Sequence, residues 1–425
     1  MKLSNIRIED LVVKGIEKSR LICDVSDCPF SKSKHLFFEV PRSYKEWLAD
    51  DVYDSFMVAL YWPIMLYNEP LEIDGKVSKK LHLNMLYDLA YSQKDFDSRL
   101  FMPIIKVKGY ADPKKNNELH VGEAFTAGVD SLATFHDHYW NPRDEDLKID
   151  TLFFFHADNT GGDPTVPEIQ AWAEANYLTL TKAFADKVGL PSCYVDNNMF
   201  EFHPKHGTDM YNGWFARMSM ILAIQRSLKC FYISADLTYG QMLKVVEMYK
   251  YQPLQMRFWY YTGQPYGCPM LSPKGLDIIP DGAIHTRDEK LELIINDPYV
   301  KDFLNVCGGG GTVAGKNCSH CRKCVTTMLA LDILGKLDEF KDVFDIEYYR
   351  KHSYGIKCRV VYLNEKEEYS MVDVELAKKH NYKLPSRIEA FIVYRILMPL
   401  YNALRINKIR RLIQPSHYKQ KEFLQ

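Results

Sequence analysis

The sequence predicts an α/β protein whose middle part is a parallel β-sheet covered by helices on both faces. From residue 118 onward, short apolar runs alternate with segments of helical periodicity, which is the pattern of repeated β–α–β units. The run Thr151–His156 (TLFFFH) is apolar almost throughout, as expected of a strand that is buried on both faces. The helical pattern of Pro167–Gly189 then supplies the long crossover that two parallel strands require.

The composition excludes several classes of protein. Of the 425 residues, 47% are hydrophobic and 26% are charged, and the formal net charge is −1, so bulk charge gives no reason to expect a stable complex with nucleic acid. No apolar run approaches the roughly 18 residues of a membrane span, and the polar start Met1–Glu9 does not resemble a signal peptide. Ten cysteines, three of them at CxxCxxC spacing, fit a reducing compartment, so we expect a cytoplasmic protein.

The chain divides by pattern into three parts. Residues 1–117 combine strand-like segments with helical stretches near Val52–Leu66 and Leu81–Tyr91, and predict an α+β domain whose role no motif indicates. Residues 118–338 carry the alternating strands and helices. Residues 339–425 are expected to be mostly helical, with a long helical pattern over Arg387–Ile413 that ends in basic residues. These residues either contact a membrane surface or RNA, or they face solvent while the helix packs on its own protein.

Three further elements complete the middle part. Cys193–Val195 predicts a third strand, Gly213–Lys229 a long helix and Cys230–Ser234 a fourth strand. In an open parallel sheet, ligands bind beyond the carboxyl ends of the strands. We therefore expect the loops that follow the first, second and fourth strands to converge on one pocket.

The turn Thr126–Ser131 (TAGVDS) joins the first of these strands to a helix. Such a turn presents free backbone N–H groups and the positive end of a helix dipole, which favour a bound phosphate. Gly128 lets the backbone approach a ligand, and the hydroxyls of Thr126 and Ser131 can donate to phosphate oxygens. Asp130 fits beside an anion when Mg²⁺ lies between the two.

The run TAGVDS resembles the S-G-G-x-D-S loop of the ATP pyrophosphatase (PP-loop) superfamily. The resemblance implies an adenine nucleotide alpha hydrolase-like, HUP-type domain that binds ATP, releases pyrophosphate and passes the adenylyl group to an acceptor oxygen. Thr126 keeps the hydroxyl of the motif, whereas Ala127 adds a Cβ that is strained if this residue needs a positive φ. The ATP-binding residues implied in this loop are Thr126, Ala127, Gly128, Val129, Asp130 and Ser131.

Four cysteines form a second motif. Cys307, Cys318, Cys321 and Cys324 have the spacing C-x10-C-x2-C-x2-C, which lets four thiolates close around one tetrahedral ion. Zn²⁺ is the expected metal, and an iron–sulfur cluster on the same cysteines is the alternative. A closed four-cysteine site leaves no open coordination position, so the metal should be structural.

Together, the two motifs resemble the 7-cyano-7-deazaguanine synthase family of PP-loop enzymes, over about residues 120–335. The resemblance extends to Arg217 and Arg287 and implies that both contribute to the ATP site, with Asp130, Ser131 and Arg217 as catalytic residues. His156 ends the second strand, where it either contacts the adenosine or is a hydrogen-bonded structural residue. The regions 1–117 and 340–425 have no counterpart in that family, so its substrate is not carried over.

The motifs predict an AMP- and pyrophosphate-forming ligase or synthase. We expect a carboxylate, deazaguanine-like or other, to be activated as an acyl-adenylate, which an amine, ammonia or a protein or peptide co-substrate then attacks to give an amide or a nitrile. ATP, Mg²⁺ and Zn²⁺ are the expected cofactors. A dimer is compatible with the sequence, which does not determine the oligomeric state.

Two other functions fit the same motifs. A PP-loop sulfurtransferase acting on tRNA or a small molecule would need a reactive thiol, for which Cys193 and Cys268 are the candidates. A non-catalytic module that binds nucleotide without turnover is favoured by Ala127, because this residue departs from the glycine of the motif.

Overall fold

A computed structural model describes residues 1–96, 98–157, 171–203, 212–249, 265–307, 316–364 and 368–397. The chain forms two compact units. The sheet unit comprises residues 1–126, 134–235 and 239–283, and the helical unit comprises residues 127–133, 236–238 and those from 284 onward. The division at residues 117 and 338 that the sequence suggests stays a prediction.

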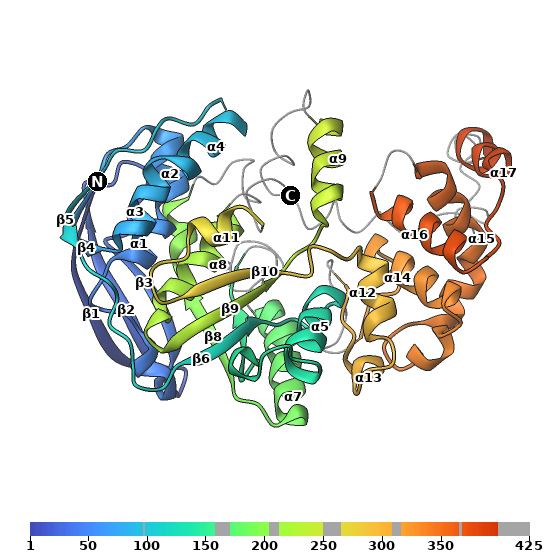
Figure 1. Ribbon diagram of the computed structural model, residues 1–425, viewed down its shortest axis with the longest axis horizontal. Coiled ribbons are helices and arrows are strands. Elements are labelled where there is room, and N and C mark those ends of the chain that lie inside the picture. The colour runs from blue at the N-terminus through green and yellow to red at the C-terminus, as the bar shows by residue number, and fades with distance from the viewer. Residues whose placement is uncertain are drawn as a thin grey trace. The chain divides into compact units, whose positions relative to one another are not determined.

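The sheet unit is an α/β structure around a mostly parallel sheet, which confirms the predicted fold class at this level. Its ten described strands lie in the order β10-β9-β6-β7-β8-β3-β2-β1-β4-β5 (Figure 1). The five strands from β10 to β8 are parallel to one another. The strands are β1 (Lys2–Val13), β2 (Ile16–Ser26), β3 (His35–Pro41), β4 (Leu71–Val77), β5 (Ile105–Tyr110), β6 (His120–Ala124), β7 (Thr151–Phe155), β8 (Ser192–Asn197), β9 (Leu228–Ser234) and β10 (Asp277–Asp281).

The first five strands of the chain extend this same sheet. β3 pairs antiparallel with β8, where Phe38 lies opposite Asn197, and β2 and β1 continue the antiparallel pairing. β4 and β5 then add two parallel strands at the far edge. The N-terminal residues therefore contribute a mixed half to a sheet whose other half is parallel.

The side chains of β7 show how both faces of the sheet are buried. Phe153 and Phe155 belong to the large core on one face, and the intervening Phe154 packs with Tyr177 and Tyr194 on the other face. This alternation follows from the two-residue period of a strand. Because both faces need apolar cover, TLFFFH reads as a continuous apolar run, as predicted.

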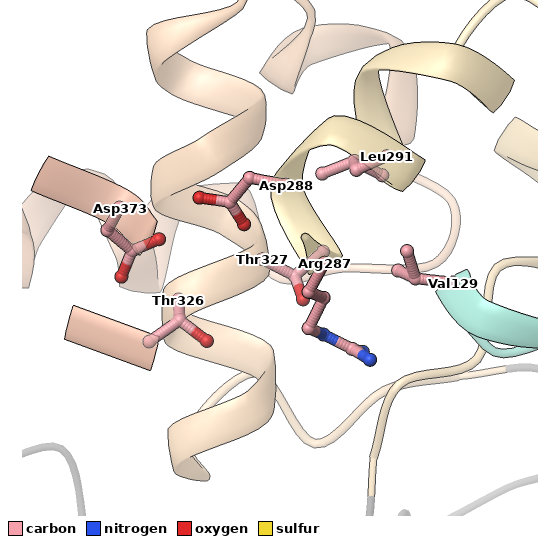
Figure 2. A pocket seen from close by; sticks show the side chains of 7 residues that line it. All are labelled: Val129, Arg287, Asp288, Leu291, Thr326, Thr327 and Asp373. Atoms are coloured by element: carbon pink, nitrogen blue, oxygen red, sulfur yellow. The ribbon is translucent and has the colours of Figure 1, made fainter. Parts of the chain in front are cut away.

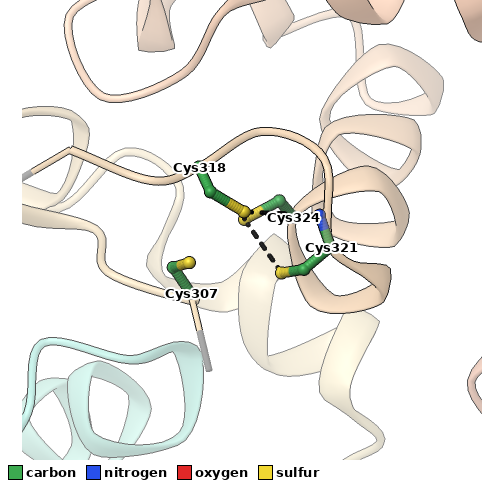
Figure 3. A group of neighbouring side chains, drawn as sticks. All are labelled: Cys307, Cys318, Cys321 and Cys324. Atoms are coloured by element: carbon green, nitrogen blue, oxygen red, sulfur yellow. Dashed lines mark hydrogen bonds between the residues drawn. The ribbon is translucent and has the colours of Figure 1, made fainter. Parts of the chain in front are cut away.

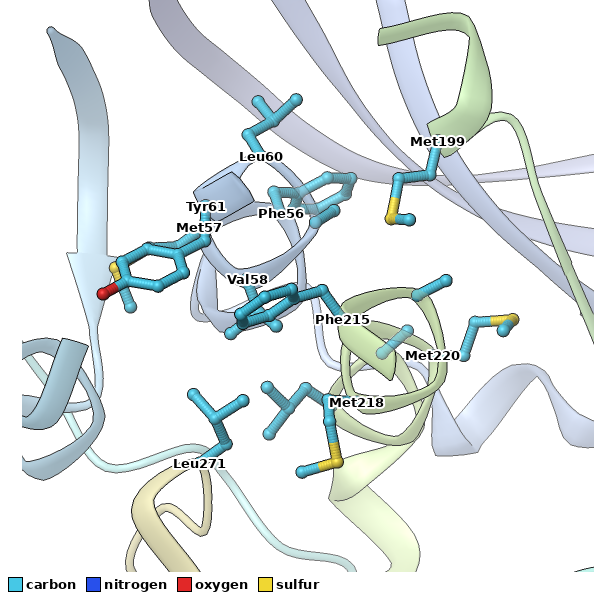
Figure 4. Packing of buried hydrophobic residues seen from close by; sticks show 14 of the residues in the cluster. Phe56, Met57, Val58, Leu60, Tyr61, Met199, Phe215, Met218, Met220 and Leu271 are labelled. Atoms are coloured by element: carbon cyan, nitrogen blue, oxygen red, sulfur yellow. The ribbon is translucent and has the colours of Figure 1, made fainter. Parts of the chain in front are cut away.

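Helices of the sheet unit supply this cover. Figure 4 shows α1 and α2 packed with α8, and the rings of Tyr61 and Phe215 lie with their centroids 5.4 Å apart. Helix α7 ends at Gly189, whose φ of 74° is left-handed, as the glycine stop signal predicts. The helices are α1 (Asp54–Ala59), α2 (Tyr61–Tyr67), α3 (Lys79–Leu86), α4 (Asp88–Phe96), α7 (Thr179–Val188), α8 (Asn212–Ala223), α9 (Tyr239–Tyr249) and α11 (Gly267–Met270).

One boundary in this unit differs from the sequence-based expectation. The helix predicted to run to Lys229 ends at Ala223, a short turn Gln225–Ser227 follows, and β9 begins at Leu228. The apolar pattern continues across this boundary because the helix end and the strand are both buried. Periodicity alone does not separate two buried elements that adjoin.

The helical unit contains no strand among its described residues. Residues 127–133, which include the first turns of α5 (Val129–Phe135), group with it. Helix α14 contacts α12, α15 and α16, and α12 also contacts α16. The other helices of the helical unit are α12 (Arg287–Ile294), α13 (Val300–Phe303), α14 (Arg322–Ile333), α15 (Ile346–Leu363), α16 (Glu368–Lys379) and α17 (Arg387–Phe391).

None of the helices in the described ranges is both long and apolar enough to cross a membrane. The basic end of the predicted helix, beyond residue 397, lies outside the described residues.

Candidate functional site

The loop at the start of α5 carries a strained residue. Ala127 has a φ of 54°, in the left-handed region, and its side chain is fully buried. Its carbonyl accepts a hydrogen bond from the backbone N–H of Asn305 at 2.8 Å. A residue with a Cβ in this region costs about 1–2 kcal/mol. The condition under which Ala127 was expected to be strained is therefore met.

The next residues of the loop turn directly into the helix. The backbone N–H of Leu132 donates to the carbonyl of Gly128 at 2.9 Å, and the Ser131 hydroxyl donates to the same carbonyl at 3.2 Å. Ser131 is almost fully buried. The loop and the helix start are thus held together by their own hydrogen bonds.

Asp130 lies between two cationic side chains of α12. Its Oδ2 accepts from the Arg287 guanidinium at 2.7 Å, and its Oδ1 accepts from the Lys290 ammonium at 3.0 Å. Arg287 is the first residue of α12 and Lys290 lies about one turn later, so both reach the same side of the helix. We call Asp130, Arg287 and Lys290 the ion triple.

A capping box holds the start of α12 in place. The Thr286 hydroxyl accepts from the backbone N–H of Glu289 at 3.4 Å, and the Glu289 carboxylate accepts from the backbone N–H of Thr286 at 2.7 Å. This arrangement satisfies two orphan donors of the first turn. Because the turn is anchored, Arg287 starts from a defined backbone position.

The ion triple is largely shielded from water. The side chain of Lys290 is 1% exposed, that of Arg287 13% and that of Asp130 17%. Burial alone would raise the pKa of Asp130, but Lys290 and Arg287 outweigh it and the net shift is downward. The carboxylate is therefore ionised at neutral pH, and two cations face one anion.

A pocket adjoins the ion triple. Figure 2 shows side chains of α12, α14 and α16 around it, with Arg287 on its wall. Asp288 and Asp373 bring two buried carboxyl groups to the same space. The lining residues are Val129, Arg287, Asp288, Leu291, Thr326, Thr327 and Asp373.

The four predicted metal ligands come together (Figure 3). Cys307, Cys318, Cys321 and Cys324 offer sulfur atoms that all lie within 4.8 Å of one another. The Sγ atoms of Cys321 and Cys324 are 3.3 Å apart, and those of Cys318 and Cys324 are 3.7 Å apart. Tetrahedral zinc with Zn–S bonds of about 2.3 Å places its sulfurs about 3.8 Å apart, so the cluster fits a metal such as zinc.

The helix start and the backbone arrange the CxxCxxC part. Cys321 is the residue before α14, and its N–H donates to the Cys318 sulfur at 3.3 Å. The ring of His320 instead packs edge-on against Tyr348, with centroids 4.0 Å apart. His320 is not among the four grouped ligands. The glycine-rich residues 308–315 lie outside the described part of the chain.

Asn317 brings the first cysteine to the other three. Its Oδ1 accepts from the backbone N–H groups of Val306 at 2.8 Å and Cys307 at 3.1 Å. Its Nδ2 donates to the carbonyls of Leu304 at 2.8 Å and Val343 at 3.1 Å. In the sequence, only its position beside Cys318 marks Asn317 for this role.

The remaining predicted site residues belong to the sheet unit. Thr126, the first residue of the loop, groups with the sheet unit, and Arg217 is half-buried on α8. His156 is buried, and its Nδ1 lies 3.0 Å from Asp196 Oδ1, as the hydrogen-bonded structural alternative predicts. Its Nε2 has no hydrogen-bond partner among the residues that the structure describes.

The two candidate sulfurtransferase thiols are both buried. Burial raises the pKa of Cys193 well above its usual value, and it raises the pKa of Cys268 to about 12 although the charge of Arg217 opposes the shift. A nucleophilic cysteine needs a lowered pKa and access to solvent. Neither thiol has the environment of a reactive cysteine.

Comparisons of the chain with family models, curated proteins and solved structures found no match.

Proposed function

We propose that the chain is an ATP-dependent adenylating enzyme of the PP-loop type, which activates a carboxylate as an acyl-adenylate and releases pyrophosphate. The supporting observation is the ion triple, in which the loop aspartate Asp130 positions Arg287 and Lys290 beside residues 127–131. Arg287 and Lys290 bring two positive charges to the start of the loop. That charge suits a polyphosphate.

The proposed nucleotide site uses the loop for the β- and γ-phosphates. Gly128 lets the backbone approach the phosphates, and Ser131 supplies a hydroxyl. Arg287 and Lys290 supply positive charge. Bound Mg²⁺ would supply further charge neutralisation and link Asp130 to phosphate oxygens. Both carboxylate oxygens of Asp130 already accept from cations, so Arg287 and Lys290 perform part of that neutralisation themselves.

The proposed reaction requires little covalent chemistry of the protein. A carboxylate oxygen of the acceptor attacks the α-phosphorus, an O–P bond forms, and the bond to pyrophosphate breaks. An amine then attacks the acyl carbon and displaces AMP. Arg287 and Lys290 hold the leaving pyrophosphate and stabilise its charge.

The cysteine cluster has a structural role in this proposal. Zinc held by four cysteines would tie the segment before residue 308 to the start of α14. Helix α14 in turn contacts α12, which carries both cations of the ion triple. Metal binding would therefore stabilise the helical unit that presents Arg287 and Lys290.

ATP–pyrophosphate exchange tests the proposal. The zinc-loaded protein with Mg²⁺ is assayed across a panel of carboxylic acids that includes 7-carboxy-7-deazaguanine. We expect exchange with at least one acid, and a loss of about a hundredfold for Arg287→Ala and for Lys290→Met. Lys336→Ala is the matched control, because Lys336 pairs with Glu339 at the surface of the same unit. Exchange that persists in both site variants would contradict the proposed role of the cations.

A nucleotide-binding module without turnover is the second candidate, and the left-handed φ of Ala127 favours it. Strain in the loop would slow a reaction that depends on the loop's geometry. Saturable ATP binding with no exchange for any acid would identify this function. Exchange that appears on substituting Ala127 with glycine would show that the loop strain limits turnover.

A further inference from the structure

The last described helix of the chain exposes a row of large apolar side chains. Helix α17 and the π-helical segment Ile392–Leu397, which continues it, together span residues 387–397. Five of the twenty large apolar side chains that are exposed in the described ranges fall within this short span. They are Ile388, Phe391, Ile392, Ile396 and Leu397. Single exposed apolar residues are normal on a protein surface, whereas such a concentration marks an interaction site.

The spacing of these residues places most of them on one side of the helix. Four of them stand at positions i, i+3, i+4 and i+8, which is the spacing of residues that share one side of a helix. We call these four residues the apolar stripe: Ile388, Phe391, Ile392 and Ile396. Ile388 is 72% exposed and Phe391 is 51% exposed. Contact of the stripe with water is unfavourable, so its burial against an apolar partner would stabilise the protein.

A different side of the same helix holds it in the fold. Helices α15 and α17 lie side by side (Figure 1). Ala390 and Val393 are buried in a small core with Cys358 of α15. The rings of Tyr362 and Tyr394 stack with their centroids 5.1 Å apart. The helix is therefore anchored to the helical unit without the use of the apolar stripe.

Positive charge accompanies the apolar stripe. Arg395 is exposed and lies about one turn after Phe391, so it shares the side of the helix that carries the stripe. The acidic residue of this helix, Glu389, accepts from the backbone N–H of Ser386 at 2.6 Å in a capping box. In the sequence, residues 398–425 add six lysines and arginines and a single acidic residue. Because the whole chain has a formal net charge of −1, this positive charge is a local property of its C-terminal end.

We propose that the apolar stripe binds the surface of a membrane that contains anionic lipids. The stripe enters the boundary between headgroups and acyl chains, and the basic residues around it contact the lipid phosphates. Both signals are needed, because four side chains bury little area and the attraction between basic residues and lipids is screened by salt. The inference goes beyond the proposed adenylation and does not depend on it, since no residue of the ion triple takes part.

The composition of the apolar stripe favours a lipid surface over two other partners. Three of its four residues are isoleucines, which offer no ring for stacking with the bases of a nucleic acid. A second copy of the chain would bury Arg395, and the stripe carries no anion to pair with it. A lipid surface accepts both kinds of side chain, because a long arginine side chain reaches the headgroups from an apolar surface.

Vesicle binding by the full-length, zinc-loaded chain tests the proposal. Cosedimentation is measured with vesicles of phosphatidylcholine alone and with vesicles that also contain phosphatidylglycerol. We expect saturable binding to the anionic vesicles that weakens as salt is added, and a loss of at least about tenfold in the double variant Ile388→Ser, Phe391→Ser. The matched double variant Val12→Ser, Leu243→Ser removes two exposed apolar side chains of the sheet unit and should bind as wild type does.

The outcomes separate a membrane from the other partners. Equal binding to neutral and anionic vesicles, no binding by folded wild type, or unchanged binding in the double variant of the stripe overturns the proposal. A dimer that this variant abolishes, in a chain that binds no vesicles, would assign the stripe to a second copy. Binding of a single-stranded RNA oligonucleotide that requires the stripe, again without vesicle binding, would assign it to RNA. Melting curves of the variants establish that each one is folded.

Fluorescence from the apolar stripe tests whether the protein itself covers it. The emission of Phe391→Trp, taken as the difference from wild type, should be that of a water-exposed indole in buffer. Lipids that are brominated on their acyl chains should quench this emission in anionic vesicles. A difference spectrum that already indicates an apolar environment in buffer overturns the proposal, because the stripe is then covered by the chain. Bound protein whose emission is not quenched overturns it as well, because the stripe then does not enter the lipid.

Discussion

The Lys290 ammonium lies 3.0 Å from Oδ1 of Asp130, and the lysine side chain is 1% exposed. This contact joins the loop at the start of α5 to the first turns of α12, two segments 160 residues apart in the chain. A cation buried this deeply needs an anion, and Asp130 supplies it. The aspartate of the loop therefore has a structural as well as a proposed catalytic role.

Substituting Asp130 should destabilise the protein as well as reduce activity. Asp130→Asn leaves the charges of Lys290 and Arg287 buried without an anion, and removing one partner of a buried ion pair costs about 3 kcal/mol. Urea unfolding should show this loss, and exchange measured on the folded protein should be abolished. Asp338→Asn, in an exposed pair, should change stability by less than about 1 kcal/mol. Wild-type stability in Asp130→Asn would contradict the structural role of the ion triple.

Glycine at position 127 should stabilise the chain. The left-handed φ of Ala127 is strained for alanine and accessible to glycine, so Ala127→Gly should raise the free energy of unfolding by about 1 kcal/mol. Ala133→Gly in α5 is the matched control and should lower it by about 1 kcal/mol or more, because glycine is unfavourable within a helix. Thermal unfolding of both variants measures the difference. A destabilised Ala127→Gly would show that the buried methyl group contributes more than the strain costs.

The buried carboxyl of Asp288 should make stability depend on pH. Its pKa is raised to about 7 when folded, against about 4 when unfolded, so the folded state binds an extra proton between these values. The contribution of the Asp288 carboxyl to the free energy of unfolding should therefore fall as the pH rises from about 4 to about 7. Arg287, Glu289 and Asp373 are the charged groups that act on it.

Asp288→Asn isolates this contribution. The variant carries no titrating carboxyl at position 288, so its free energy of unfolding relative to wild type should increase from pH 5 to pH 8. Urea unfolding at a series of pH values measures this difference. A constant difference across the range would mean that Asp288 does not take up a proton on folding.

Asn317 should control how Cys307 joins the metal site. Asn317→Ala removes four hydrogen bonds to buried backbone groups and should cost about 3 kcal/mol, together with zinc affinity. Asn317→Asp keeps the acceptor for Val306 and Cys307 and loses the donor. Its zinc affinity should therefore lie between those of wild type and Asn317→Ala. Competition with a chelator measures the affinity. Equal zinc affinity in all three proteins would refute the positioning role.

Removal of the metal should destabilise the helical unit. Cys321→Ser deletes one sulfur of the cluster, so bound zinc and the melting temperature should fall together. Metal analysis and thermal unfolding, with and without a chelator, measure both. Cys358→Ser is the control, because this buried cysteine lies outside the cluster. A Cys321→Ser protein with wild-type stability and no metal would contradict a structural role.

Local sequence patterns were sufficient to predict much of the secondary structure. The apolar run TLFFFH predicts a buried strand because a strand covered on both faces has no polar side, and Gly189 predicts a helix end because glycine accepts a left-handed φ without strain. The spacing of the four cysteines predicts their cluster because short intervals limit how far two ligands can separate. Each of these properties depends on neighbours along the chain.

Contacts between distant segments were decided only by the tertiary structure. Lys290 reads as an ordinary charged residue until α12 packs beside the loop and brings it to Asp130. Asp373 and Asn317 likewise gain their roles from chain segments that the fold places around them. The pairing of β3 with β8, which joins the N-terminal strands to the parallel half of the sheet, has the same origin. The sequence by itself determined the local elements and the ligand types, whereas long-range packing decided which side chains meet, because pairing energies depend on residues far apart in the chain.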